Sequence, residues 1–211
     1  MDTEKTIRQP KQKRSMEMKE RILSSAMRLI CEKGFFQMTT NEIAKAAGIS
    51  IGSLYSYFSD KDTILAELLE RHHNHFMTVF QTLNTEMNRR LYTENLQEWL
   101  RCLVKKLIDL HLCVKDFNKA LEELYYAKKD VAAVLDLHRE EIRKAVLELL
   151  GRNQDRVKAD DLEAASVVIV DFIDALVDRI VFKSTPVEEE RILDTGVTLL
   201  YEACFHPADE K

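Results

Sequence analysis

Residues 51–58 carry side chains whose chemistry suits contact with a nucleic acid. On a helical wheel the apolar residues fall on one side, and small, hydroxyl-bearing or aromatic residues fall on the other, with Tyr55 at the edge. The apolar set is Ile51, Leu54 and Phe58, and the opposite set is Gly52, Ser53, Ser56 and Tyr57. Hydroxyls can donate to phosphates or meet base edges, and no carboxylate repels the backbone. The pattern predicts a helix that presses this side into the major groove of double-stranded DNA.

Residues on either side of this segment could add contacts to phosphates. Lys61 falls in the first turn of the next helix, where a cation opposes the helix dipole, but free N–H groups and an ammonium together suit a phosphate. Lys13 and Arg14 lie in a polar stretch that could follow the backbone or enter the minor groove, as basic arms do. The full set of predicted DNA contacts is Lys13, Arg14, Thr39, Thr40, Ser50, Gly52, Ser53, Tyr55, Ser56, Tyr57 and Lys61.

Closely spaced helix-start signals place these side chains on short helices. Thr39 and Glu42 have the spacing of a capping box, and Ser50 can cap a helix over 51–58. Ser59, with Asp62 three residues on, can cap the next helix. Short helices joined by tight turns are typical of a helix-turn-helix, here at about residues 38–57. The alternative from pattern alone is a helical hairpin whose serines only cap.

The rest of the chain has helical periodicity throughout, with no strand-like alternation. A first helix over 15–33 ends at Gly34, and long amphipathic segments follow the helix-turn-helix. Those segments are 60–89, 94–113, 117–127, 130–150, 160–183 and 186–205, the last capped by Thr185 with Pro186 in its first position and Glu188 completing a capping box. We therefore expect an all-α protein with a basic flexible arm at 1–14, a DNA-binding module at 15–75 and a larger helical domain at 76–211.

Composition and charge limit the class of protein. Apolar residues make up 45% of the 211, enough for a hydrophobic core. The net charge is −5, but residues 1–61 hold 11 Lys and Arg against 7 Asp and Glu, a net of +4, which leaves −9 for residues 62–211. This asymmetry favours a polyanion at the N-terminal end. The cysteines are unpaired by spacing and no apolar run approaches a membrane span, so we expect a reduced, cytoplasmic protein that meets no membrane.

The helix-turn-helix stretch TTNEIAKAAGISIGSLYSYFSDKD resembles the DNA-binding signature of the TetR/AcrR family of bacterial transcription regulators. The resemblance covers about residues 16–75. The matching positions are Thr40, Ile43, Ala44, Ala47, Gly48, Ser50, Gly52, Leu54, Tyr55, Phe58, Lys61 and Asp62, with Gly34-Phe35 upstream and Ile64-Leu65 downstream. Tyr57 stands where the family often has histidine and Ile51 where it often has a basic or small residue, which leaves the base preference open.

The resemblance implies a homodimeric repressor that binds a palindromic operator and is released by a small-molecule effector. It implies a dimer interface on the last two long helices, for which the candidate residues are Ile169, Ile173, Leu176, Ile180, Leu193, Val197 and Leu200. It also implies a cavity among the middle helices, for which the candidate lining residues are Phe76, Trp99, Cys102, Leu103, Phe117, Leu121, Tyr125 and Phe172. For each cavity position the pattern favours ordinary core over a ligand contact, and we expect the dimer positions to serve partly as core.

Other functions have weaker support in the sequence. His72 and His75 could share a helix face, but spacing places no third ligand, so we expect no metal and no cofactor. The sequence carries no nucleophile elbow, phosphate loop or HExxH motif, which argues against an enzyme. The alternatives to a DNA-binding regulator are a helical interaction protein whose helix-turn-helix does not bind DNA, and an all-helical enzyme.

Overall fold

A computed structural model of the chain describes residues 9–82 and 86–207, and the side chains of residues 13–79 and 90–207. Its elements are α1 (Gln9–Lys33), α2 (Thr40–Ala46), α3 (Ile51–Tyr55), α4 (Lys61–Thr82), α5 (Glu86–Glu94), α6 (Leu96–Cys113), α7 (Lys115–Ala127), α8 (Lys129–Arg152), a 3-10 turn (Gln154–Arg156), α9 (Leu162–Phe182) and α10 (Glu189–Cys204). The described residues form no strands beyond a single bridge between Val157 and Phe205. The predicted all-helical fold is confirmed, and no described helix is long and apolar enough to cross a membrane.

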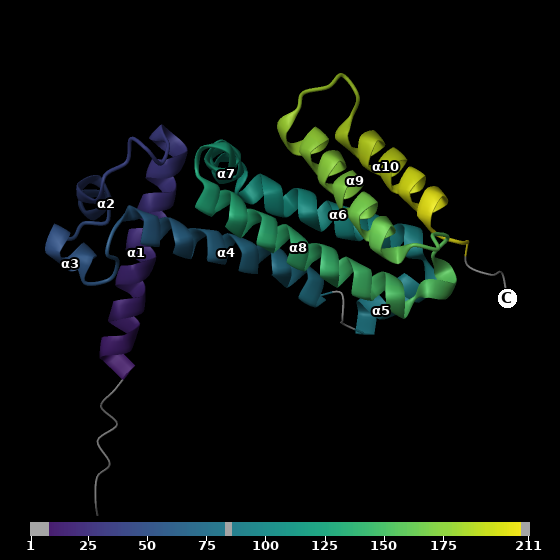
Figure 1. The fold of residues 1–211 in the computed structure, drawn as a ribbon, viewed down its shortest axis with the longest axis horizontal. Coiled ribbons are helices and arrows are strands. Elements are labelled where there is room, and N and C mark those ends of the chain that lie inside the picture. The colour runs from purple at the N-terminus through teal and green to yellow at the C-terminus, as the bar shows by residue number, and fades with distance from the viewer. Residues whose placement is uncertain (1–8, 83–85, 208–211) are drawn as a thin grey trace, which may run out of the picture.

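Two hydrophobic cores organise these helices. The N-terminal core joins α1–α4, from Ile22 to Leu69, with residues from α7 and the start of α8, among them Phe117 and Val131. The C-terminal core runs from Phe76 on α4 through α6, α9 and α10 to Phe205. Figure 1 shows α4 running from the small N-terminal helices into the larger bundle, so one continuous helix belongs to both cores.

The N-terminal core takes part of its apolar surface from beyond residue 75. Phe117, Leu121 and Leu124 of α7 are all buried against α1–α4, and α7 packs on α1. Lys128, between α7 and α8, reaches Asp62 at 2.6 Å and lies 5.3 Å from the centre of the Phe35 ring. Helices α1–α4 therefore do not close their core alone.

Several predicted helix boundaries are wrong, each for a local reason. Helix α1 begins at Gln9, so residues 9–14 are helical, and residues 1–8 of the predicted arm lie outside the described part. Helix α4 is capped by Asp60, whose Oδ1 accepts from Thr63 N at 2.8 Å, and not by Ser59 with Asp62. The segment predicted at 60–89 contains α4 and the start of α5.

The last helix also begins later than predicted. Thr185 Oγ1 accepts from Val187 N at 3.3 Å, so its side chain closes a short turn two residues ahead. Helix α10 starts at Glu189 with Glu188 in the N-cap position and no side-chain cap. The predicted capping box from Thr185 to Glu188 does not form, and Pro186 precedes the helix.

Candidate nucleic-acid interface

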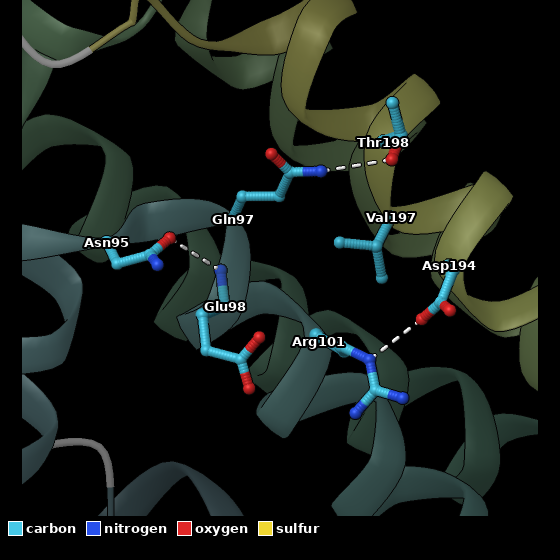
Figure 2. A pocket seen from close by; sticks show the side chains of 7 residues that line it. All are labelled: Asn95, Gln97, Glu98, Arg101, Asp194, Val197 and Thr198. Atoms are coloured by element: carbon cyan, nitrogen blue, oxygen red, sulfur yellow. Dashed lines mark hydrogen bonds and ion pairs between the residues drawn. The ribbon is translucent and has the colours of Figure 1, made fainter. Parts of the chain in front are cut away.

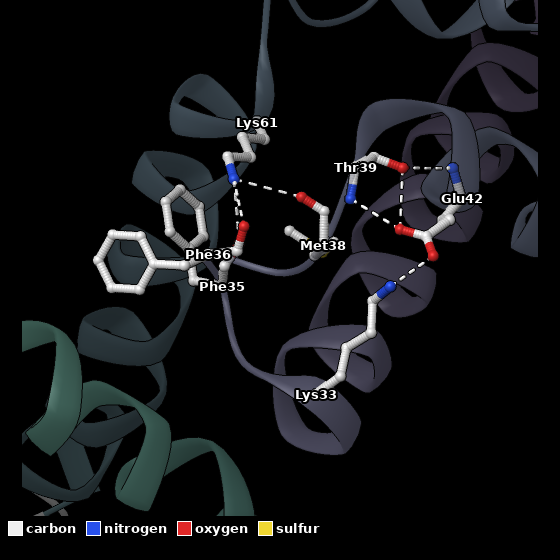
Figure 3. A network of polar contacts seen from close by, with 7 residues as sticks. All are labelled: Lys33, Phe35, Phe36, Met38, Thr39, Glu42 and Lys61. Carbon is white, nitrogen blue, oxygen red and sulfur yellow. Dashed lines mark hydrogen bonds and ion pairs between the residues drawn. The ribbon is translucent and has the colours of Figure 1, made fainter.

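Helix α2 is fixed at its start by a capping box. Thr39 Oγ1 accepts from Glu42 N at 3.3 Å, and Glu42 Oε2 accepts from Thr39 N at 2.9 Å. The other carboxylate oxygen of Glu42 is paired with Lys33 at the end of α1 (Figure 3). The Lys33 ammonium and the Thr39 donors lower the pKa of Glu42 to about 2. This acid is therefore ionised and paired, and the predicted capping box is confirmed.

The turn between α2 and α3 depends on Gly48. Its φ of 66° lies in the left-handed region, which a residue with a Cβ adopts at a cost. Arg21 of α1 donates through Nη2 to the carbonyl oxygens of Ala47 and Gly48. The distance from Nη2 to the Gly48 oxygen is 3.3 Å. The same guanidinium would lie 3.1 Å from a Cβ at position 48. The turn that sets the angle between α2 and α3 is thus held by backbone geometry and by α1.

We expect Gly48→Ala to destabilise the chain by about 1–2 kcal/mol, because alanine pays the left-handed penalty at this position. Gly151, near the end of α8, is the matched control, since a Cβ there meets nothing within 4 Å. Gly151→Ala should be neutral or stabilising by up to about 1 kcal/mol. Urea unfolding followed by circular dichroism measures both. Equal effects of the two substitutions would show that the turn tolerates a side chain.

Helix α3 presents a polar side made of small and aromatic residues. Ser50 is its N-cap and accepts from Ser53 N at 3.1 Å, as predicted. Leu54 and Phe58 are buried in the N-terminal core. The helix ends at Tyr55, three residues before the predicted end, because Ser56 N bonds back to Ser53 O and the chain turns so that Phe58 reaches the core.

The exposed residues of α3 and its turn are Gly52, Tyr55 and Ser56, with Ser53 half-buried. Tyr55, predicted at the edge, is 52% exposed, whereas Tyr57, predicted outward, is partly buried against the N-terminal core. The early end of α3 explains why the exposures of Tyr55 and Tyr57 differ from the prediction. A helical wheel gives the direction of a side chain only within a helix, and Tyr57 lies beyond the end of α3. Helix α3 itself contains no acidic residue.

Helices α2 and α3 meet through their hydroxyls. Thr40 Oγ1 lies 3.2 Å from Tyr55 OH, so the first turn of α2 and the end of α3 form one continuous polar surface. Lys45, on the last turn of α2, is exposed and was not among the predicted contacts. A helical wheel of α2 would have placed it on the side opposite the buried Ile43 and Ala44.

Lys61 holds the module together in the free protein. Its Nζ donates to the carbonyls of Phe35, Phe36 and Met38 at 3.1, 3.3 and 3.2 Å, as Figure 3 shows. It also lies 4.6 Å from the centre of the Phe35 ring. These contacts join the start of α4 to the loop before α2. The Lys61 ammonium therefore helps to position the helix-turn-helix.

Helix α1 carries the predicted basic residues at its N-terminal end. Lys13 and Arg14 are both exposed there. Further along, Lys19 pairs with Glu67 of α4 at 2.8 Å, and Glu20 accepts from Arg71 at 2.7 Å. These pairs fix α1 against α4 and thereby fix the direction in which Lys13 and Arg14 extend.

Comparisons with known proteins identify this arrangement. The model of the bacterial regulatory proteins of the tetR family matches residues 22–68, and that of the tetracyclin repressor-like C-terminal domain matches residues 77–202. The second match alone covers more than half of the 211 residues. The chain belongs to the TetR family. The part that matches the model of the bacterial regulatory proteins contains the helix-turn-helix described above.

Individual relatives agree with this assignment. YvaF of Bacillus subtilis, an uncharacterized HTH-type transcriptional regulator, is 31% identical over 67% of this chain and 71% of its own length. The HTH-type transcriptional regulator SAB2452 of Staphylococcus aureus is 34% identical over 35% of this chain and 40% of its own. The chain spans less than half the length of several curated relatives that it matches.

The fold extends over nearly the whole chain. The crystal structure of a Mesorhizobium loti protein that carries the TetR-family name covers 92% of this chain and 99% of its own, with a TM-score of 0.71 and 17% identity. At this identity the likeness concerns the fold. The larger helical domain of this TetR-family regulator, for which the sequence offered only length and helical texture, therefore has the family's architecture.

Six of the eight residues predicted to line an effector cavity divide between the two cores of this TetR-family chain. Phe76, Trp99 and Leu103 are buried in the C-terminal core, and Phe172 packs against it. The N-terminal core instead contains Phe117 and Leu121. Cys102 and Tyr125 are half-buried, and Tyr125 OH donates to Asp136 at 2.9 Å. The predicted set thus does not meet in one place.

Two surface cavities in the described part of the chain are lined by other residues. One, of about 260 Å³, lies between α6 and α10 and is lined by Asn95, Gln97, Glu98, Arg101, Asp194, Val197 and Thr198 (Figure 2). Arg101 Nε donates to Asp194 at 2.8 Å, and Gln97 donates to Thr198 at 3.0 Å across this cavity. The other, of about 340 Å³, lies at the α9–α10 loop beside Lys115. Two residues predicted for the dimer interface lie at these cavities: Val197 lines the first and Ile180 lines the second.

The residues predicted for the dimer interface pack inside the single chain. All seven are at most 9% exposed: Ile169, Ile173, Leu176, Ile180, Leu193, Val197 and Leu200. The large apolar side chains that α9 and α10 leave exposed are Val167, Val168 and Leu199. A second copy that packs on α9 and α10 would contact the exposed side chains, because the seven predicted residues already lie in the C-terminal core.

Proposed function

We infer that this TetR-family regulator binds a palindromic operator as a homodimer and represses transcription from the cytoplasm. The observation that carries the inference is the exposed side of α3. Gly52, Tyr55 and Ser56 are exposed there, and α3 contains no acidic residue. The nearest acid on α2, Glu42, is already paired with Lys33. A polyanion can approach this surface with hydroxyl donors in reach of phosphates and bases and no unpaired carboxylate on the two helices.

The apolar surface left exposed on α9 and α10 supports the proposed dimerisation. Val167 and Val168 on α9 and Leu199 on α10 are exposed apolar residues on adjacent helices. Packing a second copy there would form an antiparallel arrangement of four helices and an isologous interface. Two copies of α3 would then face the same side of a duplex. A separation of about 34–36 Å, one helical turn of DNA, would let them read two half-sites.

A small-molecule effector would act by moving α4. Phe76 of α4 lies in the C-terminal core with Trp99 and Leu103 of α6, and α4 packs directly on α6. A molecule inserted among these side chains would have to separate the two helices. Since α4 also begins within the DNA-binding module, this displacement would move α3. The effector releases DNA only if it binds the displaced state more tightly.

Selection of DNA fragments by the purified protein tests the proposal. We expect recovery of fragments with inverted repeats, and a gel-shift affinity that falls steeply with rising salt, because phosphate contacts release counterions. A compound screen for loss of the shifted band would then find the effector. Failure to select any fragment would favour the alternative of an interaction protein whose helix-turn-helix does not bind DNA, and turnover of a substrate would favour an enzyme.

We expect substitution of the two exposed cations on α1 to change the salt dependence. Lys13→Ala with Arg14→Ala should reduce the slope of log affinity against log salt by about 1 for each phosphate contact that is lost. Lys144→Ala is the matched control, an exposed lysine on α8 outside the predicted DNA-binding surface. Fluorescence anisotropy at several salt concentrations gives both slopes. A double variant with the wild-type slope would exclude a role for these two residues.

A further inference from the structure

Histidines gather where α4 passes from the DNA-binding module into the larger domain. Five of the six histidines in the chain, His72, His73, His75, His111 and His138, lie on α4 or on helices that pack against it. His72 of α4 is packed between aromatic rings, with centroids 4.7 Å from Phe76 and 5.8 Å from Phe117. Its Nε2 lies 2.7 Å from Asn118 Oδ1 on α7, so the imidazole N–H donates to the amide oxygen.

The imidazoles of His73, His111 and His138 join α4 to α8 and α6. The His73 ring stacks on that of His138 of α8, with centroids 4.0 Å apart, and His73 Nε2 lies 2.7 Å from Glu141. The His111 ring of α6 stands edge-on to Phe76 at 4.7 Å, and its Nδ1 donates to Leu107 O at 2.8 Å. The α4 histidine cluster, defined as these five residues, thus contacts three other helices.

Three imidazoles of the cluster, those of His72, His111 and His138, lie in surroundings that favour the neutral form. Burial, with a smaller contribution from the neighbouring His111, His138 and His75, lowers the pKa of His72 to about 4, against the opposing hydrogen bond to Asn118. Burial also lowers the pKa of His111 and of His138. Three acids face the cluster and work in the opposite direction: Glu141 of α8 and Glu70 of α4 beside His138, and Asp178 of α9 beside His111. These carboxylates do not outweigh burial, since the pKa of His111 and that of His138 remain lowered.

We propose that the α4 histidine cluster is a pH-sensitive latch, which holds α4 against α6, α7 and α8 when its imidazoles are neutral and releases α4 when they are protonated. Burial of the rings against Phe76 and Phe117 suits the neutral form, and charge on one imidazole is repelled by the next. Because α4 is continuous from Lys61 to Thr82, release at its C-terminal half moves the DNA-binding module. The expected consequence for DNA, weaker binding at acidic pH, rests on the proposed function. The release of α4 is independent of the proposed function.

The sign and size of the effect follow from the pKa of His72. In a released state this residue would be solvated and titrate near its ordinary value of about 6.5, whereas in the latched state it titrates near 4. The released state therefore binds more protons between these two pH values and gains population as the pH falls through that window. For His72 alone, the ratio of released to latched protein rises about tenfold between pH 7.5 and 5.5. His111 and His138 shift it in the same direction.

Amide hydrogen exchange tests the latch without DNA. After correction for the intrinsic rate, exchange within residues 70–79 should rise about tenfold from pH 7.5 to pH 5.5, while α9 and α10 stay protected. His72→Gln, which keeps an amide donor towards Asn118 but cannot be charged, should reduce that rise, and His111→Gln provides a second variant if the first does not fold. His206→Gln, at an exposed histidine outside the cluster, should behave as wild type. Unchanged exchange, or an equal rise in every helix, would overturn the proposal.

Operator binding at the same two pH values tests the consequence. Acid adds positive charge overall and should strengthen phosphate contacts, so a several-fold loss of wild-type affinity at pH 5.5 that His72→Gln diminishes would have to come from the cluster. Strong binding that does not weaken at pH 5.5 would overturn the link to DNA. An absence of binding at pH 7.5 would instead refute the proposed function, and the exchange experiment would still decide whether the latch exists.

Discussion

Gly52→Glu should abolish specific DNA binding while leaving the chain folded. The position is exposed, and a Cβ there meets only Ser50 Oγ at 4.0 Å, so the free protein has room for the side chain. Against a duplex, the new carboxylate would sit where α3 approaches phosphates and base edges. Like charges at an interface cost several kcal/mol, and with the added bulk we expect at least about a hundredfold loss of affinity. Fluorescence anisotropy with a selected operator measures it.

Two further substitutions at the same position separate charge from bulk. Gly52→Gln has nearly the shape of the glutamate without its charge, and should lose less affinity and show a milder salt dependence. Gly52→Ala adds only a methyl group to the helix and should keep most of the binding. Thermal unfolding of all three should stay close to wild type. If Gly52→Glu binds the operator normally, α3 does not enter the groove and the proposed interface is wrong.

Local signals predicted the helix-turn-helix well because they act over three or four residues. The capping box of Thr39 with Glu42 and the N-cap at Ser50 depend on side chains that bond to nearby backbone, and both form as expected. Where two local options compete, spacing does not choose between them. Asp60 and Ser59 could each cap α4, and only the packed structure shows that Asp60 reaches Thr63.

Long-range contacts decide what the sequence left open. The role of Lys61 as a donor to three carbonyls depends on a loop more than 20 residues earlier in the chain, which no pattern places beside it. The predicted cavity residues fell into two cores because periodicity identifies an apolar side of a helix but not the helix that covers it. Phe117 and Phe172 were both candidates for the lining of one cavity, and Phe117 lies in the core of the DNA-binding module.

Helices α9 and α10 also show that helical periodicity does not identify what covers an apolar side of a helix. Helix α9 has apolar residues on more than one side, with Ile169 buried and Val168, one position earlier, exposed. Periodicity alone could not say which side faces the chain's own core and which remains for a second copy. The structure assigns the more regular set, from Ile169 to Ile180, to the core. The exposed valines then become the more informative positions for testing association.

Val168→Glu should convert the protein to a monomer and remove most of its operator binding. The side chain is 64% exposed on α9, so the substitution leaves the core of the single chain intact. In a two-fold interface that includes this position it would bury one carboxylate from each copy without a partner, at a cost of several kcal/mol. A monomer presents a single α3, and loss of the second half-site contact should lower affinity by a hundredfold or more. Sedimentation velocity and anisotropy give the two readouts.

Val134→Glu provides the matched control for that experiment. It places the same charge on an exposed valine of another long helix, α8, at 36% exposure, on a surface to which no interface is assigned. This variant should stay dimeric and bind the operator as wild type does. If both variants remain dimeric, the interface lies away from Val168. If Val168→Glu is monomeric yet binds a full operator with unchanged affinity, a single copy of α3 suffices for recognition and the two-fold reading of a palindrome fails.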